Sequence, residues 1–499
     1  MGVTNVLAFD FGASSGRSIL GSFDGDTIKL SETHRFSNDP VFVNGHLYWD
    51  ILRLLFEIKA GILKTANSGL GEISGIGIDT WGVDFGLIDK NGELLGNPYH
   101  YRDSRTDGMI AKANELAGEL DIYCETGIQT LWFNTLYQLL AAKENSPHLL
   151  GEAKTLLFMP DLMNYFLTGV KTTEYSIAST SQLLNIETRD WSDKIFKKFG
   201  FDETLFTDIV MPGTVIGKIK EDIAQEAGIP SVPVIAVTSH DTASAVASVP
   251  FDNLENSVYI SCGTWSLMGM ELSQPLVNDM TREYNFTNEG GAENTIRFLK
   301  NIMGLWIVQE CRRFWQRTDS GLTFATLENL ASEAEGFVSF IDCDYEDFGS
   351  PGNMPEKVKD YCRRTNQPVP ESMGEIVRCV AQSIALKYRY TIECIEDITG
   401  KKIETINMVG GGIKDRMLCQ FTANATGRPV KAGPVEATAA GNIILQLIAL
   451  GKIESLAKGR EIVKNSFSTE DYLPKDSKLW NEAYERFLKI LSLQKGGEK

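Results

Sequence analysis

Short runs of apolar residues separated by turn residues dominate the first hundred positions of the chain. Apolar and small side chains alternate over 6–12, and a glycine-rich turn at 13–17 separates this run from a second one at 18–23. Asp24-Gly25-Asp26 then predicts a hairpin into residues 27–30. The chain is therefore expected to open with antiparallel strands.

A helical pattern follows, and strands return after it. Apolar residues at helical spacing predict a helix over 50–65, and Ile73 to Ile78 is a buried strand that runs into Asp79-Thr80-Trp81-Gly82. Residues 85–88 form the next predicted strand. Strands mixed with helices indicate the α/β class.

The second half repeats this order of elements. A buried strand at 234–237 precedes a helix of small residues at 243–248, and strands at 258–261 and 267–270 flank a glycine turn. Strand, glycine turn and strand thus occur near the start of each half. We predict two related domains that meet near residue 250.

The remaining elements are mostly helical. A stripe of apolar side chains predicts a long helix over 370–398, which Gly400 ends. A strand at 406–409 leads into the triplet Gly410-Gly411-Gly412, with a helix after it. A helix over 437–450 follows, and the charged tail from about residue 455 is also expected to be helical.

Composition narrows the possible partners. The chain has 48 Lys plus Arg against 66 Asp plus Glu, a net charge of −18, and no basic run that would bind nucleic acid. No apolar stretch approaches the ~18 residues needed to span a bilayer, and the N-terminus lacks the pattern of a signal peptide. We therefore expect a cytoplasmic protein with no nucleic-acid or membrane partner. The eight cysteines include no CxxC pair, which argues against a zinc site.

Glycine turns at strand ends are the candidate phosphate sites, because the P-loop, protein-kinase and dinucleotide signatures are absent. Residues 10–17 combine small residues, two hydroxyls and Arg17, which suit a polyphosphate, with Asp10, which suits Mg²⁺. Cys262-Gly263-Thr264 and the triplet at 410–412 are the second and third turns. Each turn alone is more simply a tight turn, and three together favour phosphate binding.

Asp241 is the candidate catalytic group. It follows a buried strand, where open α/β sheets bind ligands, and a carboxylate there can accept the proton of an attacking hydroxyl. From the residues alone, an equally good interpretation is that Asp241 or Thr242 caps the helix that follows.

Two polar, aromatic loops suit a sugar. They are Asp79-Thr80-Trp81-Gly82-Val83-Asp84 and Tyr101-Arg102-Asp103-Ser104-Arg105. The alternatives are a core role for Trp81 and a surface ion pair between Arg102 and Asp103.

Taken together, these stretches resemble the FGGY carbohydrate kinases of the actin-like ATPase superfamily over essentially the whole chain. The resemblance is carried by residues 13–17, 77–85, 101–105, 239–245, 263–269 and 299–306, and by the glycine triplet. It implies two actin-like (ribonuclease H-like) domains, each a mixed sheet flanked by helices, with the active site in an interdomain cleft. The implied domains are 1–247, which binds sugar and phosphate, and 253–455, which binds adenine nucleotide, with a helical tail at 456–499.

The resemblance also implies a reaction and a set of roles. The reaction is the ATP-dependent phosphorylation of L-rhamnulose to L-rhamnulose 1-phosphate in L-rhamnose breakdown, with Asp241 as general base. Sugar contacts are implied for Gly82, His240, Asp241 and Thr242, and the loops add Thr80, Trp81, Arg102 and Asp103. ATP contacts are implied for Ala13, Ser14, Ser15, Gly16, Arg17, Thr264, Asn301, Gln309, Gly411 and Gly412, and Asp10 would place Mg²⁺ through water.

Three other functions stay open at this point, and one of them is a non-catalytic sugar sensor that binds sugar without turnover. The substrate could be another ketose, such as L-fuculose, L-ribulose or L-xylulose, because a pocket rejects a moved hydroxyl only when it pairs with that group. An actin-like ATPase switch that binds a protein partner is the alternative from another class. A monomer or a homodimer is expected.

Overall fold

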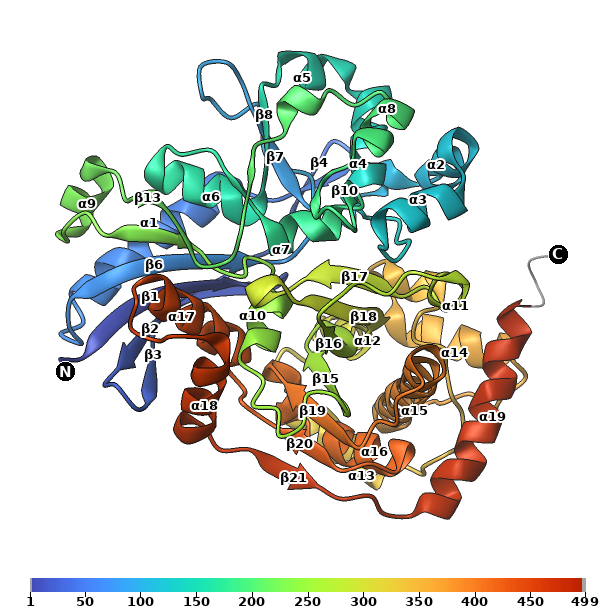
Figure 1. Ribbon diagram of the computed structural model, residues 1–499. Coiled ribbons are helices and arrows are strands. Elements are labelled where there is room, and N and C mark those ends of the chain that lie inside the picture. Colours follow the sequence, from blue (N-terminus) through green and yellow to red (C-terminus); the bar gives the residue numbers. More distant parts are fainter. Residues whose placement is uncertain (1, 496–499) are drawn as a thin grey trace. The chain divides into compact units, whose positions relative to one another are not determined.

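The computed structural model describes residues 2–495, and the chain divides into two compact units (Figure 1). Unit 1 comprises Met1–Pro250, Glu271–Leu299 and Glu436–Phe467, and unit 2 comprises Phe251–Met270, Lys300–Val435 and Ser468–Lys499. Each unit contains a mixed sheet with helices, which confirms the predicted α/β class with two sheet-containing parts. Among the described residues, every helix is too short or too polar to cross a membrane.

A six-stranded sheet forms the centre of unit 1. Its strands are β1 (Thr4–Phe11), β2 (Ser15–Phe23), β3 (Ile28–Ser37), β6 (Ile73–Thr80), β13 (Thr214–Lys218) and β14 (Pro233–Ala236). They run in the order β13-β14-β6-β1-β2-β3, with β14, β6 and β1 parallel and the other pairings antiparallel. Because β1 has neighbours on both sides and is covered by helices, its apolar residues are fully buried.

Helices α1 (Ile51–Ala66), α10 (Asp241–Ala247) and α17 (Ala437–Ala449) position the site of unit 1. The apolar stripe of α1 packs toward β2 and β3, and Asp50 caps its first turn. α17 packs against β1, β6 and α10. Gly441 allows this last contact, because a Cβ there would lie 1.8 Å from the carbonyl oxygen of Ser244.

A second apolar cluster of unit 1 lies between residues 85 and 211. Its helices are α2 (Met109–Ala117), α3 (Glu119–Thr126), α4 (Thr135–Asn145), α5 (Pro147–Glu152), α6 (Met159–Thr168), α7 (Tyr175–Ala178), α8 (Asp193–Phe199) and, nearby, α9 (Glu221–Ala227). Short ladders join β4 (Val41–Val43) to β5 (His46–Tyr48), β7 (Phe85–Ile88) to β8 (Thr155–Phe158), β9 (Thr173–Glu174) to β12 (Ile209–Val210), and β10 (Leu184–Asn185) to β11 (Asp190–Trp191).

Later parts of the chain complete unit 1. Strands β17 (Thr287–Gly290) and β18 (Ile296–Met303) pair in antiparallel register, so that Glu289 lies opposite Arg297. The helices α11 (Asp279–Glu283) and α18 (Leu456–Ser466) also belong to this unit.

Unit 2 holds most strands of a seven-stranded mixed sheet that also contains β17 and β18, and β18 continues past Leu299 into unit 2. In it β15 (Ser257–Cys262) pairs with antiparallel β16 (Trp265–Leu272) and parallel β19 (Thr405–Val409), and β20 (Val430–Ala432) and β21 (Glu470–Tyr472) follow. Its helices are α12 (Trp306–Trp315), α13 (Phe324–Glu333), α14 (Met354–Arg364), α15 (Met373–Thr399), α16 (Arg416–Thr426) and α19 (Ser477–Lys495). A capping box of Ser372 and Glu375 starts α15, and Gly400 ends it in the left-handed conformation.

Several elements differ from the prediction. β2 begins at Ser15, not at residue 18, because residues 15–17 pair with the end of β3, which runs to Ser37 rather than to residue 30. α10 begins at Asp241 rather than at residue 243. The triplet is followed first by a short 3₁₀ turn, Gly411–Lys414, and the tail contains the strand β21 as well as helices. All eight cysteines are free thiols.

Candidate active site

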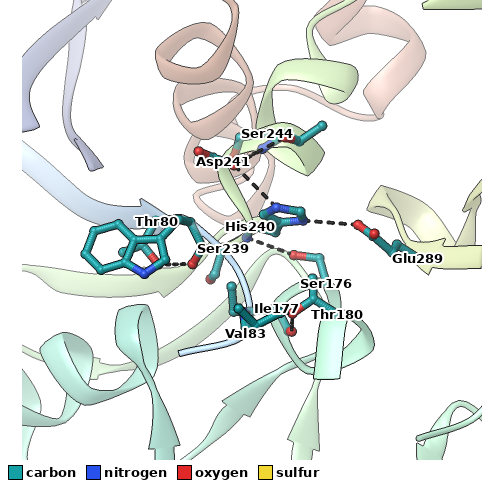
Figure 2. A network of polar contacts seen from close by, with 12 residues as sticks. Thr80, Val83, Ser176, Ile177, Thr180, Ser239, His240, Asp241, Ser244 and Glu289 are labelled. Carbon is teal, nitrogen blue, oxygen red and sulfur yellow. Dashed lines mark hydrogen bonds and ion pairs between the residues drawn. The ribbon is translucent and has the colours of Figure 1, made fainter. Parts of the chain in front are cut away.

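Asp241 lies at the first position of α10, just beyond the end of β14. The segment before it is extended, and the Ser239 carbonyl accepts a hydrogen bond of 2.8 Å from Thr80 N–H at the end of β6 (Figure 2). The ends of two parallel strands therefore hold the start of this helix. His240 rather than Asp241 occupies the N-cap, and its side chain makes no capping hydrogen bond. The capping interpretation holds in part, because Asp241 Oδ1 accepts from the N–H of Thr242 in the first turn of α10.

The carboxylate of Asp241 is arranged asymmetrically. Its Oδ1 accepts hydrogen bonds from the backbone N–H and the hydroxyl of Thr242, at 2.6 and 3.2 Å. None of the described residues donates to Oδ2, and 29% of the side chain is exposed. Burial raises the pKa of Asp241, as does the negative charge of Asp10, whereas His240 lowers it. A raised pKa makes this carboxylate a stronger proton acceptor near neutral pH.

His240 is fixed through both ring nitrogens. Nε2 lies 3.4 Å from Asp241 Oδ1, and Nδ1 lies 3.3 Å from Glu289 Oε2 (Figure 2). Nδ1 is also 3.2 Å from Nη2 of Arg297. The backbone N–H of His240 donates to Ser176 Oγ at 3.2 Å. Neither Glu289 nor Arg297 was predicted, because both lie about fifty residues away in the chain.

Glu174 organises the backbone before Asp241. This fully buried carboxylate accepts hydrogen bonds from the N–H and hydroxyl of Ser176, from Ile177 N–H and from Ser239 N–H, at 2.6–3.1 Å. Burial raises its pKa, although these hydrogen bonds lower it. Sequence reasoning missed Glu174, and no local pattern around it indicates this role.

Asp10 and Arg17 face each other across the β1–β2 ladder. Arg17 Nη2 and Nε donate to Asp10 Oδ2 at 2.7 and 3.1 Å, and Nη1 also contacts Glu436. Burial lowers the pKa of Arg17, but the two carboxylates raise it more, so the pKa lies above its ordinary value. The predicted phosphate ligand Arg17 is thus already paired with two carboxylates.

Asp79 is a buried acid beside Asp10. The two residues are register partners on the parallel strands β1 and β6. Asn442 donates to Asp79 Oδ2 at 2.6 Å, while Oδ1 is buried without a hydrogen-bond partner among the described residues. Burial, and next the charge of Asp10, hold the pKa of Asp79 well above its usual range.

The first glycine turn is shorter than predicted. Only Gly12, Ala13 and Ser14 lie outside the strands, whereas Ser15, Gly16 and Arg17 belong to β2. The buried Asn38 stabilises the turn, because its side chain donates to the Gly12 carbonyl at 2.9 Å and its N–H to the Ser14 carbonyl at 3.1 Å. Ala13 and Ser14 stay accessible at its tip.

Two hydrogen bonds hold the loop after β6 in place. Thr180 Oγ1 accepts from Val83 N–H at 3.1 Å, and the Thr80 hydroxyl donates to the Trp81 carbonyl at 2.8 Å (Figure 2). Val83 has a φ of 67°, an unusual value for a β-branched residue that costs roughly 1–3 kcal/mol. A Cβ on the neighbouring Gly82 would lie 3.1 Å from Thr180 Oγ1.

Trp81 is buried and takes part in a hydrogen-bond network around Asp84. Its ring packs on Trp49 with centroids 4.0 Å apart, and both indole N–H groups donate to Asp84 Oδ2, at 3.0 and 2.6 Å. Gln138 donates to Asp84 Oδ1 at 2.8 Å. Burial raises the pKa of Asp84 to about 6, although these three hydrogen bonds lower it.

Asp84 is expected to make folding stability depend on pH. Its pKa in the folded protein lies above the ordinary value of 3.8, so its contribution to stability is full below that pH and is lost as the pH rises through about 6. Asp84→Asn removes this dependence. The difference in thermal midpoint between wild type and Asp84→Asn should therefore fall from about pH 4 to about pH 7. A constant difference would contradict the prediction.

Arg102 and Asp103 do not form the simple surface pair considered above. Asp103 is only 3% exposed, and it accepts hydrogen bonds from His46 Nδ1, Leu47 N–H and Arg105 N–H at 2.7–3.0 Å. The guanidinium of Arg102 lies over the ring of Tyr101. Asp103 thus anchors the β4–β5 hairpin to this loop.

In unit 2, the other two glycine turns lie side by side. β15 and β19 are parallel neighbours, with Ser261 opposite Val409, so the turns after them meet. A Cβ on Gly412 would lie 2.4 Å from Cys262 Sγ, and one on Gly410 would lie 3.0 Å from the Cys262 carbonyl oxygen. Nothing lies within 4 Å of a Cβ on Gly411, so that position is open.

Thr264 and Gln309 also meet in unit 2. Thr264 Oγ1 donates to Gln309 Oε1 at 3.2 Å, and the first turn of α12 donates from Trp306 N–H to the Thr264 carbonyl at 3.0 Å. Asn301 lies on β18 and is half-buried. The structure thus brings together Thr264, Gln309, Gly411 and Gly412, all predicted from different segments to hold nucleotide.

The fit of a magnesium ion can be tested on the acids of unit 1. The described residues include no cluster of three or more His, Cys, Asp or Glu side chains arranged to hold a metal directly. The negative charge of Asp10 nevertheless raises the pKa of both Asp79 and Asp241. A cation would relieve this repulsion, so the donor set fits a hydrated ion held through water better than one bound directly.

Comparison with known proteins identifies the family. The FGGY family of carbohydrate kinases matches with its N-terminal domain over residues 5–247 and with its C-terminal domain over residues 258–450. A rhamnulokinase of Bacteroides thetaiotaomicron is 44% identical over 97% of this chain and 98% of its own length. One of Oceanobacillus iheyensis is 43% identical over 93% and 97%.

Solved structures agree on the fold. The gluconate kinase of Lactobacillus acidophilus superposes with a TM-score of 0.82 over 99% of this chain and 98% of its own, at 16% sequence identity. The fold is therefore the actin-like one that the sequence resemblance implied. On the matches of both domains and on the identity to these relatives, the chain belongs to the FGGY family of carbohydrate kinases.

Proposed function

We propose that this chain transfers the γ-phosphoryl group of ATP to the 1-hydroxyl of L-rhamnulose, giving ADP and L-rhamnulose 1-phosphate in L-rhamnose breakdown. The observation that carries the substrate is the similarity to proteins named rhamnulokinase over nearly the whole chain. The geometry at Asp241 supports the reaction type, since a partly exposed carboxylate with one uncommitted oxygen suits a general base.

Asp241 acts on the attacking hydroxyl. Its Oδ2 accepts the proton as the sugar oxygen forms a bond to the γ-phosphorus, and the bond from that phosphorus to the β-γ bridging oxygen breaks to release ADP. The pKa of Asp241, which burial raises, favours this proton transfer near neutral pH. Thr242 keeps Oδ1 occupied, and Oδ2 is left for the substrate.

The sugar is held by the residues around this carboxylate. Thr80, Gly82, His240 and Thr242 are assigned to it because their segments meet at the ends of β6 and β14. Trp81, Arg102 and Asp103 belong to the adjoining loops. Trp81 is only 6% exposed, so a small part of this residue is open to the sugar.

The nucleotide is assigned to the glycine turns. Ala13, Ser14, Ser15, Gly16 and Arg17 would contact the phosphates, and Thr264, Asn301, Gln309, Gly411 and Gly412 would hold the rest of ATP. Open space over Gly411 and the accessible tip at Ser14 support this. Arg17 must exchange one of its two carboxylate partners to reach a phosphate.

Magnesium is assigned to Asp10, through water. When bound, the ion neutralises phosphate charge. The carboxylate of Asp10 stays paired with Arg17, which orients it toward the end of the sheet.

We also propose what each range of the chain binds, where the protein is located and how many copies associate. Residues 1–247 bind sugar and phosphate, and residues 253–455 bind adenine nucleotide. The C-terminal tail is 456–499; its described part, to residue 495, contains β21 as well as helices, and 496–499 lie outside the described residues. We keep a cytoplasmic monomer or homodimer as the prediction.

A coupled assay of ADP release with MgATP tests the function. The sugars are L-rhamnulose, L-fuculose, L-ribulose, L-xylulose and glycerol, and a reaction without sugar is the blank. We expect turnover that depends on sugar and is fastest with L-rhamnulose. A different leading ketose would keep the kinase and overturn the substrate. A blank as fast as every sugar would favour the ATPase switch and overturn the role of Asp241.

A further inference from the structure

Glu289 and Arg297 form a buried ion pair behind His240. They are direct cross-strand partners on β17 and β18, with Arg297 Nη2 3.0 Å from Glu289 Oε2. Arg297 is fully buried and Glu289 is 4% exposed. Taking two charges out of water is costly, and such a pair adds little net stability over apolar residues. Its position against a site residue therefore points to a role beyond packing.

The guanidinium of Arg297 has a single orientation. Nε donates to the Gly290 carbonyl at 2.8 Å, and Nη2 donates to Glu289 Oε2. This orientation places Nη2 3.2 Å from Nδ1 of His240. The pKa of Glu289 lies below its ordinary value: burial raises it, and the charge of Arg297 is the largest cause that lowers it.

We propose that Arg297, anchored by Glu289, donates a hydrogen bond to Nδ1 of His240 and so holds the ring proton on Nε2, the nitrogen that faces Asp241. Both residues are positioning residues. Their effect on catalysis rests on the proposed function, in which Asp241 is the base.

The chemistry of the groups supports this tautomer. Arg has five donors and no acceptor, so a nitrogen that binds it must be the acceptor of the ring. The other nitrogen of the neutral ring then carries the proton. Nε2–H lies 3.4 Å from Asp241 Oδ1, the oxygen that Thr242 also contacts. Nε2–H thus joins the N–H and the hydroxyl of Thr242 at Oδ1, and Oδ2 is left as the oxygen that takes the substrate proton.

Glu289 is the competitor for Nδ1, at 3.3 Å. Its charge is offset by Arg297, which is closer to it and permanently charged. The other charged group that faces His240 is Asp241, and Asp10 and Asp79 act on Asp241 in turn. Without Arg297, the Glu289 carboxylate would draw the ring proton to Nδ1.

Nitrogen NMR of the intact protein tests the tautomer directly. The chain has five histidines, so long-range ¹H–¹⁵N spectra of ¹⁵N-histidine-labelled protein are simple, and His240→Gln identifies the His240 signals. We expect a protonated Nε2 and an unprotonated Nδ1 in the wild type at neutral pH. A protonated Nδ1 in the wild type overturns the proposal, and this result needs no other variant to fold.

Arg297→Met is the decisive variant, and Arg460→Met is its matched control. Arg460 forms another ion pair, partly buried, with Glu271, and contacts the Val246 and Ala247 carbonyls at the far end of α10. We expect Arg297→Met to move the proton to Nδ1 and Arg460→Met to leave the His240 signals unchanged. Unchanged signals in Arg297→Met, or equal changes in both, overturn the proposal. If Arg297→Met does not fold, the wild-type spectrum alone decides the tautomer, and a protonated Nδ1 there overturns the proposal.

Turnover gives the second readout. With the best sugar of the panel, kcat of Arg297→Met should fall roughly tenfold or more, the scale for partners that orient a histidine, while the KM for ATP is unchanged. An unchanged kcat would overturn the positioning role even if the tautomer moves. If no sugar is turned over by the wild type, the proposed function fails, and the NMR result still decides the tautomer.

Discussion

Replacing Asp241 with asparagine is expected to lower kcat by about 100-fold or more and to leave the KM for sugar within several-fold. Asparagine keeps the size of the side chain and can still accept from Thr242, but it cannot take the hydroxyl proton at Oδ2. Because the loss falls on the chemical step, the KM should change little.

Thermal unfolding separates this effect from misfolding. The folded-state pKa of Asp241 is raised, so ionisation of this group costs stability as the pH rises toward neutrality. Asp241→Asn removes that cost and should be at least as stable as the wild type at neutral pH. Asp193→Asn, at an exposed acid of α8, is the control and should keep full activity. Turnover near the wild-type rate in Asp241→Asn would contradict the assignment.

Gly441→Ala is expected to have the largest effect on stability. The added Cβ would lie 1.8 Å from the Ser244 carbonyl oxygen and 2.6 Å from its carbon, so the backbones of α17 and α10 must separate. Overpacking of this kind costs roughly 1–3 kcal/mol and sometimes more. Because α10 starts at Asp241, the displaced helix should also lower turnover. Thermal melts and the ADP-release assay measure both effects.

Gly151→Ala is the matched control. Gly151 lies in α5, and nothing lies within 4 Å of a Cβ built there. Alanine in an exposed helix is favoured over glycine by up to about 1 kcal/mol, so this variant should melt at the wild-type temperature or slightly above it. Equal melting temperatures for the two variants would contradict a close contact at Gly441.

Local patterns in the sequence predicted most elements of the fold. The stripe that predicted a helix over 50–65 corresponds to α1, and the long apolar stripe closed by Gly400 corresponds to α15. Both depend on residues a few positions apart. The start of β2 was missed because residues 15–17 become part of the strand by pairing with the end of β3, about twenty residues further along the chain.

The residues of the candidate site also fall into two groups: those visible in local sequence patterns and those that reach the site only through the fold. Asp241 and the glycine turns were found because strand ends and turn residues are visible in short segments. Glu174, Glu289 and Arg297 were missed because each meets the site through a tertiary contact, and none of their neighbours indicates it. The family resemblance implied roles for Asp241 and the glycine turns, but none for Glu174, Glu289 or Arg297.

The order of the segments along the chain has a consequence for synthesis on the ribosome. Unit 1 is interrupted twice by segments of unit 2, and its last segment, Glu436–Phe467, includes α17. Ile443 and Ile444 of that helix pack in one cluster with Val6 and Ala8 of β1. Translation must therefore pass residue 449 before α17 can cover β1. Until then the nascent sheet exposes an apolar face to water, so we expect trigger-factor-like or Hsp70-like holding of the chain during its production, and we expect fragments that stop near residue 250 to be insoluble.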